Sequence, residues 1–583
     1  FKDKKLWIQG IPKLKTIEQF FNERGGYKVI GEVKGKDLVG LKYIGVFDEL
    51  PAQRIAGGHP FKKEELSDKN ITAVDCHRVL DGGKDAKGGY IVVSGEGTGI
   101  VHIAPGCGAI DNKLGNKNDL VNISPLDDES KYIDSFDWLT GKSATSKDTI
   151  DSIIDNLKEK GFLFAVEKYP HVYPHCWRSG DELVYRMVDE WYINMDWRDD
   201  IKKVVKTINW IPDWGKDREM EWLSNMGDWM ISKKRFWGLA LPIWVFEDGS
   251  FYVVGSKKEL EELAIEGWDE FKGNTPHRPW IDKVKIKHPD SGLIGSRIPD
   301  VGNPWLDAGI VPFSTLGYDK DRKYWEKWFP ADFVVECFPG QFRNWFYSLL
   351  AMSTMLENTA PFKLLLGHAL VKDQDGREMH KSWGNAIWFD DAAEKMGVDV
   401  MRWMYASQNP EQNLLFGYSA ADEVRKNIIT LWNVYSFFVT YSRIDGFHLE
   451  RDYDLQDLEK IDRWIISKVN LFIKNAGKYY EKFQVYLLME EATKLLNNIS
   501  NWYVRRNRRR FWKSENDTNK ETAYYTLYTV IYNYIKVLSP VVPFITEEIY
   551  LNLSKIGADK KFKSIHLSPF PVYEDKLIDH NLI

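Results

Sequence analysis

A run of amphipathic helical segments between residues 455 and 555 constrains the fold of this chain more than any other feature. Segments such as DRWIISKVNLFI and AYYTLYTVIYNYIKVL place apolar residues three and four positions apart, which is the spacing of a helix that buries one face. Consecutive helices of this kind bury their apolar faces by packing against one another. This part of the chain is therefore predicted to form a helical bundle.

A basic segment with aromatic borders lies inside this region. NWYVRRNRRRFW, residues 501–512, places five arginines within less than two helical turns. Arginine pairs with phosphates and stacks on bases, and aromatic rings supply platforms for unpaired bases. The alternative is a solvated charged face with buried aromatic residues behind it. The residues concerned are Arg505, Arg506, Arg508, Arg509 and Arg510, with Trp502, Tyr503, Phe511 and Trp512 at the borders.

Size and composition bound the class of protein. At 583 residues the chain exceeds one hydrophobic core, and about 150 residues per domain suggests three or four units. A hydrophobic content of 43% and a charged content of 28% are typical of a soluble globular protein. The sequence shows no membrane-spanning apolar stretch and no leader, so a cytoplasmic location is expected. Because the net charge is -6, any contact with a polyanion must come from local clusters.

Cysteine and histidine usage gives no metal site. The cysteines are too widely spaced for a disulfide framework, so reduced thiols are expected. His171, His175 and Cys176 invite a zinc interpretation, but structural zinc usually takes paired cysteines, and Ser179 stands where the partner of Cys176 would be. No structural zinc is therefore expected. The four cysteines are Cys76, Cys107, Cys176 and Cys337.

The first 165 residues alternate short apolar runs with Gly-rich turns, a pattern that predicts a β-rich domain. Within it, GEGTGIVHIAPGCGAID spans residues 95–111. A strand is predicted at Ile100–Ile103, with His102 and Asp111 flanking the bend that follows. The alternative is a hairpin with a structural histidine.

Two later stretches end a short apolar run in a loop. They are NPWLDAGIVPFSTL, residues 303–316, and VVECFPGQFRNWFYSLLAMSTML, residues 334–356. Open α/β sheets bind ligands at the carboxyl ends of their strands. Asp307, Glu336 and Gln341 are therefore candidate site residues, the alternative being helix caps and turn formers.

The stretch DQDGREMHKSWGN, residues 373–385, places a Gly-bearing turn and a Lys-Ser pair before an apolar helical segment. An ammonium on a long flexible stem can follow charge as it builds on phosphate oxygens. Lys381 is the candidate for this role. A plain surface turn is the alternative.

In their order along the chain, these stretches resemble the isoleucyl-tRNA synthetases, which are class I aminoacyl-tRNA synthetases. WGLALPIW and NWYVRRNRRRFW favour this family over the valyl and leucyl ones. EMHKSWGN stands where the family has Lys-Met-Ser-Lys-Ser followed by Gly-Asn. The other matching segments are GTGIVHIAPG, WIPDWGKDR, DWMISKKRFWG, LPIW, NPWLDAG, QFRNWFYSLL and DRWIISKVN.

The resemblance implies a multidomain α/β fold. Residues 1–165 would be part of a β-rich inserted editing domain, and residues 166–370 the second half of a doubly wound, Rossmann-like catalytic domain. Residues 371–450 would hold the signature loop and stem-contact helices, and residues 451–583 a helical anticodon-binding domain. No His-Ile-Gly-His motif is present, so the expectation is a fragment, truncated at both ends and inactive by itself in aminoacylation.

The activity implied is that of an isoleucine-tRNA ligase. ATP, with Mg2+, would activate isoleucine to the adenylate, the acyl group would pass to tRNA(Ile), and mischarged valine would be hydrolysed, since a pocket alone separates the two amino acids only modestly. A monomer is expected. The alternatives are a catalytically impaired tRNA-binding paralogue, a valyl or leucyl synthetase, and another nucleotidyl transferase on the same scaffold.

The resemblance also implies roles for residues of the loop at 373–385. Lys381 matches the second lysine of the family motif, and Met379 and Ser382 match their positions. Glu378 replaces the first lysine, and His380 replaces the first serine and would supply a pH-sensitive donor. Lys381 and Ser382 are thus expected to be catalytic, and Lys381, Met379 and His380 to bind ATP.

Three further groups of residues follow from the same resemblance. Glu336, Gln341 and Trp345 are expected to bind the aminoacyl-adenylate, although the family's glutamate aligns with Cys337, one position away. Asp111 would hold the substrate ammonium in editing, with His102 beside it and Cys107 where the family commonly has histidine. Contacts to tRNA are expected from Arg505, Arg506, Arg509 and Trp502.

Overall fold

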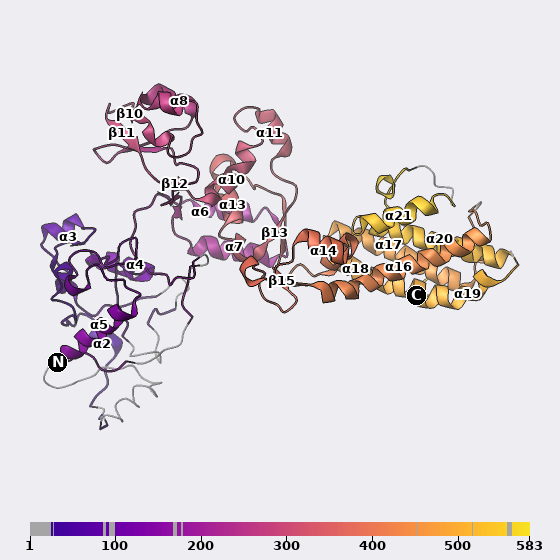
Figure 1. Cartoon of the computed structure of the whole chain (residues 1–583), viewed down its shortest axis with the longest axis horizontal. Coiled ribbons are helices and arrows are strands. Elements are labelled where there is room, and N and C mark those ends of the chain that lie inside the picture. The colour runs from indigo at the N-terminus through magenta and orange to yellow at the C-terminus, as the bar shows by residue number, and fades with distance from the viewer. Residues whose placement is uncertain are drawn as a thin grey trace. The chain divides into compact units, whose positions relative to one another are not determined.

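The computed structural model describes residues 25–26, 28, 30–84, 89–92, 100–166, 172–176, 179–449, 452–515, 517–556 and 562–583. The chain forms two compact units, Phe1–Trp191 and Tyr192–Ile583 (Figure 1). Within the described ranges no helix is both long and apolar enough to cross a lipid bilayer.

The first unit contains short elements joined by long turns. Strands β1 and β2 pair in parallel, with Gly58 opposite Asn122. The longest helix, α5, begins where the Ser146 hydroxyl accepts the Thr149 N–H, as expected of an N-cap. The elements are α2 (Gly35–Leu38), η1 (Pro51–Arg54), β1 (Gly58–His59), α3 (Glu64–Asp68), η2 (Val74–Cys76), α4 (Ala109–Lys117), β2 (Asn122–Ile123), η3 (Asp137–Leu139) and α5 (Lys147–Glu159).

The β-rich expectation for residues 1–165 is met only in part. Among the described residues of this unit, strand pairing consists of β1 with β2 and a few isolated bridges, such as Lys42 with Arg78. The strand predicted at Ile100–Ile103 is wrong, because these residues belong to no strand. Apolar alternation favours an extended backbone, but a strand also needs a neighbour in register.

A three-stranded parallel sheet organises the second unit. Its order is β13 (Val334–Cys337), β14 (Leu364–His368) and β4 (Asn209–Ile211), with Glu336 opposite Gly367. Trp210 is buried in this sheet and packs against Phe338, Phe346 and Phe362. Around the sheet lie α6 (Arg198–Val205), α7 (Trp214–Asn225), α10 (Pro304–Ser314), α11 (Arg322–Trp328), α12 (Phe338–Gln341) and α13 (Trp345–Glu357). This architecture confirms the predicted parallel α/β fold of this part of the chain.

A small antiparallel sheet interrupts this part of the chain, and no pattern in the sequence predicted it as a separate body. Its five strands follow the order β8-β7-β11-β10-β9 around a core that includes Trp244 and Ile286. β6 (Ser232–Lys233) and β12 (Val301–Gly302) pair with each other where the chain leaves and returns. The elements are β7 (Ile243–Val245), β8 (Phe251–Val253), α8 (Lys257–Leu263), β9 (Ala264–Glu266), α9 (Trp268–Phe271), η4 (Ile281–Lys283), β10 (Lys285–Lys287) and β11 (Ile294–Arg297). A further pair joins β3 (Tyr192–Ile193) to β5 (Trp229–Met230).

The predicted helical bundle is confirmed. Figure 1 shows its long helices lying alongside one another, and residues such as Phe438, Ile465 and Leu527 form its buried core. A parallel pair, β15 (Val371–Asp373) with β16 (Leu414–Phe416), precedes it. The remaining elements are η5 (Lys381–Trp383), α14 (Phe389–Met396), α15 (Val398–Ser407), α16 (Tyr418–Ile444), η6 (Leu455–Asp457), α17 (Lys460–Glu481), α18 (Val485–Asn497), the π-helix η7 (Asn498–Val504), α19 (Arg505–Trp512), α20 (Thr518–Leu538), α21 (Pro543–Leu553), η8 (Ile565–Leu567) and η9 (Asp575–Leu577).

Candidate functional site

The Lys381 loop, residues 373–385, follows the central strand of the parallel sheet. β14 ends at His368, and β15, which begins at Val371, leads directly into the loop. The loop opens as a tight turn in which the Asp373 N–H donates to the Arg377 carbonyl at 2.9 Å and Gly376 adopts a φ of +81°. Because ligands of open α/β sheets bind beyond the carboxyl ends of the strands, the loop leaves the sheet on the side where a ligand is expected.

Asp373 and Asn385 join the two ends of the loop. The Asp373 carboxylate accepts N–H groups from Asp375 and Arg377 and the Asn385 amide. The hydrogen bond from Asn385, followed by that from Arg377, holds the pKa of Asp373 below its usual value. Asn385 also accepts the His380 N–H and donates to the Glu378 carbonyl. A carboxylate and an amide therefore shape the loop around Lys381.

Lys381 is exposed and rests on an aromatic ring. Its Nζ lies 4.4 Å from the ring centroid of Trp388, in cation–π geometry. His380 lies 3.4 Å from the Glu378 carboxylate and packs its ring edge-on against Trp383. Within the described part of the chain the Lys381 ammonium makes no ion pair. The ammonium is thus available to an anionic ligand. Met379 is half-buried, and Ser382 follows Lys381 in η5.

Glu336, Gln341 and Trp345 lie on the one segment that runs from β13 to α13. The Glu336 carboxylate accepts the N–H of the next residue, Cys337, at 2.7 Å, and the Gln341 amide oxygen accepts the Trp345 N–H at 3.2 Å. Gln341 therefore caps the start of α13, as the helix-cap alternative expected. No hydrogen bond or ion pair among the described residues joins this segment to the Lys381 loop.

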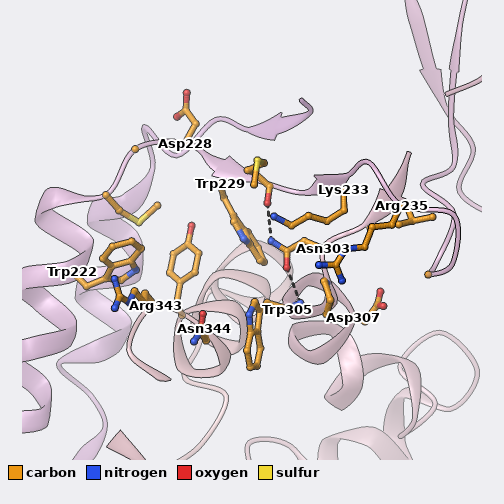
Figure 2. A pocket seen from close by; sticks show the side chains of 18 of the residues that line it. Trp222, Asp228, Trp229, Lys233, Arg235, Asn303, Trp305, Asp307, Arg343 and Asn344 are labelled. Carbon is orange, nitrogen blue, oxygen red and sulfur yellow. Dashed lines mark hydrogen bonds between the residues drawn. The ribbon is translucent and has the colours of Figure 1, made fainter. Parts of the chain in front are cut away.

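A cavity of about 500 Å³ lies beside this segment (Figure 2). It is enclosed by the end of α7, the β5–β6 connection, the start of α10 and the start of α13. Asn303 ties two of these parts together, because its side chain accepts the Trp305 N–H and donates to the Met230 carbonyl. The lining includes Trp222, Trp229, Trp237, Trp305, Tyr347, Lys233, Arg235, Arg343, Asp228, Asp307, Asn303 and Asn344.

The cavity combines unpaired cations with indole walls. Lys233, Arg235 and Arg343 line it and form no ion pair within the described ranges. Asp307 Oδ1 is buried without a hydrogen-bond partner there, and burial raises the pKa of this carboxyl group. Such a lining suits a ligand that carries both negative charge and a planar ring. Sequence reasoning named Asp307 but missed the three cations, although the run Lys233-Lys234-Arg235 before Phe236-Trp237 was a usable signal.

The candidate editing residues lie on the segment that leads into α4 and in the first turn of that helix. Asp111 lies in the first turn of α4, and its carboxylate accepts the Ala104 N–H at 2.9 Å. Burial, and secondarily the charge of Asp111, raises the pKa of the Cys107 thiol. His102 is exposed, and no hydrogen bond joins it to Asp111 in the described structure. Residues 95–99 of this motif, and His171, lie outside the described residues.

The arginine-rich segment divides into an outer and an inner set. Arg505, Arg506, Arg508 and Arg509 are exposed, as is Trp502, whose ring lies 4.5 Å from the Arg506 guanidinium. Arg510, in contrast, donates at 2.8 and 2.9 Å to the two carboxylate oxygens of the buried Asp462. Grouping Arg510 with the outer cluster was therefore wrong. Arg510 stands seven positions after the buried Tyr503, on the same face of the helix, and it points into the core beside Tyr503 and Phe511.

Comparison with known proteins assigns the chain to a family. Residues 27–416 match the model of class I tRNA synthetases (I, L, M and V), and residues 462–582 match the anticodon-binding domain of tRNA ligases. The chain belongs to the class I tRNA synthetases.

Several relatives of this chain carry the name isoleucine–tRNA ligase. It is 36% identical to the isoleucine–tRNA ligase of Pyrococcus horikoshii over 95% of this chain and 52% of that protein. Identity to the enzyme of Methanocaldococcus jannaschii is 36% over 100% of the chain and 53% of the relative. Identity to the isoleucine–tRNA ligase of Clostridium novyi is 38% over 96% of this chain and 51% of that protein. The chain spans about half the length of these curated relatives.

Proposed function

We propose that the protein containing this chain is an isoleucine-tRNA ligase. The isoleucine carboxylate would attack the α-phosphorus of ATP to form isoleucyl-AMP with release of pyrophosphate, and the acyl group would then pass to the terminal ribose of tRNA(Ile) with release of AMP. The observation that carries the proposal is the match of 36–38% identity, along almost the whole chain, to proteins named isoleucine–tRNA ligase.

The Lys381 loop is proposed to hold the triphosphate of ATP. Lys381 has no carboxylate partner among the described residues and rests on Trp388, a contact worth only about 0.5–1 kcal/mol at an exposed site. The ammonium is therefore free to move onto phosphate oxygens, and Ser382, Met379 and His380, its neighbours in the chain, are proposed to complete the site. Mg2+ would enter bound to the phosphates and neutralise their charge.

Glu336, Gln341 and Trp345 are proposed to contact the aminoacyl-adenylate. Glu336 and Gln341 each use one oxygen for a backbone N–H, so each retains acceptor capacity for a ligand. Asp111, with His102, is proposed to hold the ammonium group of a mischarged amino acid. Because its Oδ2 already accepts the Ala104 N–H, Asp111 is held in place and keeps its other oxygen for the substrate.

The exposed part of the arginine segment is proposed to contact tRNA. Arg505, Arg506 and Arg509 lie on the surface of the bundle, and the guanidinium of Arg506 is stacked on Trp502. A guanidinium held over a ring keeps its N–H groups directed outward, which suits pairing with phosphate oxygens.

Pyrophosphate exchange into ATP tests the enzymatic part of the proposal. The longest natural protein containing this chain is expected to exchange only when isoleucine is present, and Lys381→Ala should lower the rate by about 100-fold or more, as loss of one transition-state donor does. Lys372→Ala, which removes a lysine of β15 before the loop, is the control. Equal exchange with valine or leucine would reject isoleucine specificity.

A second candidate is a catalytically impaired tRNA-binding paralogue. It is favoured by Glu378 and His380 in the family's lysine and serine positions, and by Cys337 at the adenylate glutamate. In that case tRNA binding would be lost when Arg505, Arg506 and Arg509 become Glu, while no adenylate would form with any amino acid.

A further inference from the structure

Two loops of the catalytic half-domain stack their side chains on one another. The loop after β6 presents Phe236 and Trp237, and the loop before η4 presents His277 and Arg278. The Trp237 and His277 rings are parallel, with centroids 4.9 Å apart and an interplanar angle of 7°. The Arg278 guanidinium lies 5.0 Å from the Phe236 ring. We call Arg235, Phe236, Trp237, His277 and Arg278 the Trp237 platform.

The polar contacts of Arg278 fix the two loops of the platform to each other and to the following turn. Arg278 donates to the Arg235 carbonyl at 3.2 Å, which ties one loop to the other. The same guanidinium pairs with Asp282 at 2.8 Å, so its position is set by a carboxylate of the following turn. The rings are therefore presented by a supported structure, and little ordering is left for a ligand to impose.

The two aromatic rings of the platform, Phe236 and Trp237, are largely exposed to solvent. Trp237 is 70% exposed and Phe236 is 59% exposed, although His277 and Arg278 each cover a ring face. An indole that is already stacked on one side and exposed on the other can accept a second planar group. Exposed rings of this size beside one another are uncommon on a surface that binds nothing.

The platform leads into the cationic cavity. Arg235 and Trp237 both line the cavity, together with Lys233 and Asp307. Figure 2 shows Arg235 and Asp307 on the same side of it. Arg235 and Lys233 form no ion pair within the described chain, and His277 Nδ1 and Asp307 Oδ1 are buried there without hydrogen-bond partners. Free cations and unused polar atoms thus accompany the open ring.

We propose that the Trp237 platform binds the unpaired 3′ nucleotides of the tRNA. A base would stack on the open face of Trp237, and Arg235 and Lys233 would neutralise phosphates at the mouth of the cavity. This combination of an aromatic platform with backbone-tracking cations is how proteins hold single-stranded nucleic acid. An acidic peptide would match the charge but would make no use of the stacked rings.

This inference rests on the proposed function in its choice of RNA segment. Acyl transfer takes place at the 3′ end, so that end must reach the catalytic half-domain, to which the platform belongs. The arginine segment of the bundle is a separate surface, formed by a different part of the chain. The two surfaces would therefore contact different parts of one tRNA.

Binding of two RNA hairpins to the full chain tests the proposal. One hairpin carries a short unpaired 3′ extension, and the other is blunt. We expect the extended hairpin to bind more tightly, and Trp237→Ala to weaken its binding by about tenfold, as loss of one base stack does, without changing the affinity for the blunt one. Trp237→Phe should restore part of the affinity. Trp328→Ala removes another exposed indole, 60% exposed on α11, and should change neither affinity.

The binding measurements distinguish failure of the platform proposal from failure of the proposed function. If both hairpins bind wild type equally, or if Trp237→Ala weakens both alike, the platform proposal is wrong. Full-length tRNA(Ile) is then compared between Trp237→Ala and the variant with Glu at 505, 506 and 509. Binding lost only in the bundle variant overturns the platform and leaves the tRNA partner standing. Binding of the extended hairpin that depends on Trp237, without any binding of tRNA(Ile) beyond that of unrelated RNA, supports the platform and rejects the tRNA assignment.

Discussion

The Asn385 side-chain amide donates a 2.8 Å hydrogen bond to the Asp373 carboxylate across the base of the Lys381 loop. The two residues stand twelve positions apart, and their contact encloses the segment that carries His380 and Lys381. Asn385 also bonds to the backbone of Glu378 and His380. One side-chain amide therefore satisfies two backbone groups of the loop, the Glu378 carbonyl and the His380 N–H.

Asn385→Ala is expected to loosen this loop without unfolding the domain. Three hydrogen bonds are lost, so the His380 amide should exchange with deuterium faster and the loop should be cleaved sooner by protease after Arg377. Asp375→Ala is the matched control, because the side chain of Asp375 is exposed and only its backbone N–H bonds to Asp373. Unchanged exchange at His380 in Asn385→Ala would contradict this role.

The same carboxylate predicts a pH dependence of the loop. The folded pKa of Asp373 lies below its usual value because Asn385 and Arg377 donate to the charged form. Its stabilising contribution is therefore present above about pH 4, the unfolded value for Asp, and is lost as the pH falls through the lower folded value. Hydrogen exchange at His380 should accelerate in wild type below about pH 4 and should show no such step in Asp373→Asn.

Trp388 is expected to hold Lys381 in its resting position. The ammonium lies 4.4 Å from the ring centroid, so ring currents should shift the Lys381 ε-methylene protons upfield in an NMR spectrum. Trp388→Leu should abolish this shift, and Trp388→Phe should retain part of it. Trp383→Leu is the control, because that ring contacts His380 and not Lys381. A shift that survives in Trp388→Leu would rule out the contact in solution.

Glu219 is expected to destabilise the catalytic half-domain as the pH rises. The residue is fully buried in α7, both carboxyl oxygens lack a partner in the described structure, and burial raises its pKa well above the usual value. Glu219→Met, of similar volume, should raise the free energy of unfolding at pH 8 by about 1–3 kcal/mol. Urea denaturation of wild type and variant measures this.

The sign of the effect follows from proton binding. Above about pH 4.3, the usual value for Glu, the unfolded chain releases the proton while the folded chain retains it, so stability falls with rising pH up to the folded pKa. The advantage of Glu219→Met should therefore be larger at pH 8 than at pH 5. Glu221→Gln, which changes a half-buried neighbour paired with Arg218, should show little change at either pH. An equal gain at both pH values would show that Glu219 titrates normally.

Arg510→Ala is expected to destabilise the bundle strongly. It would leave the buried Asp462 carboxylate without its bidentate partner, at a cost of about 3–5 kcal/mol. Arg509→Ala, one position earlier and exposed, should cost less than about 0.5 kcal/mol. Thermal denaturation followed by circular dichroism compares the two. Similar losses for both variants would mean that Arg510 is not part of the core.

Local patterns in the sequence were sufficient to predict the helical bundle and the Gly-bearing turn before Lys381, and to show the family resemblance. Apolar spacing reports which face of a helix is buried, and a glycine such as Gly376 marks a backbone bend. These features depend on residues close together in the chain. Lys381 and Trp502, which the structure shows to be exposed, lie in the loop and in the helical segment that these patterns predicted.

Only the tertiary structure decided which of these residues meet. Trp237 and His277 are forty positions apart in the sequence, and Arg510 and Asp462 are forty-eight positions apart. The spacing of apolar residues within a segment predicts neither contact. The cavity draws its cations from β6, from the loop after it and from the residues just before α13. Residues 100–103 belong to no strand, because apolar alternation does not specify which segment a strand would pair with. The composition of a segment and the spacing of its apolar residues determine whether it forms a helix or a strand and which face is buried. A site depends on how elements far apart in the sequence pack together, and that packing is specified by the whole chain.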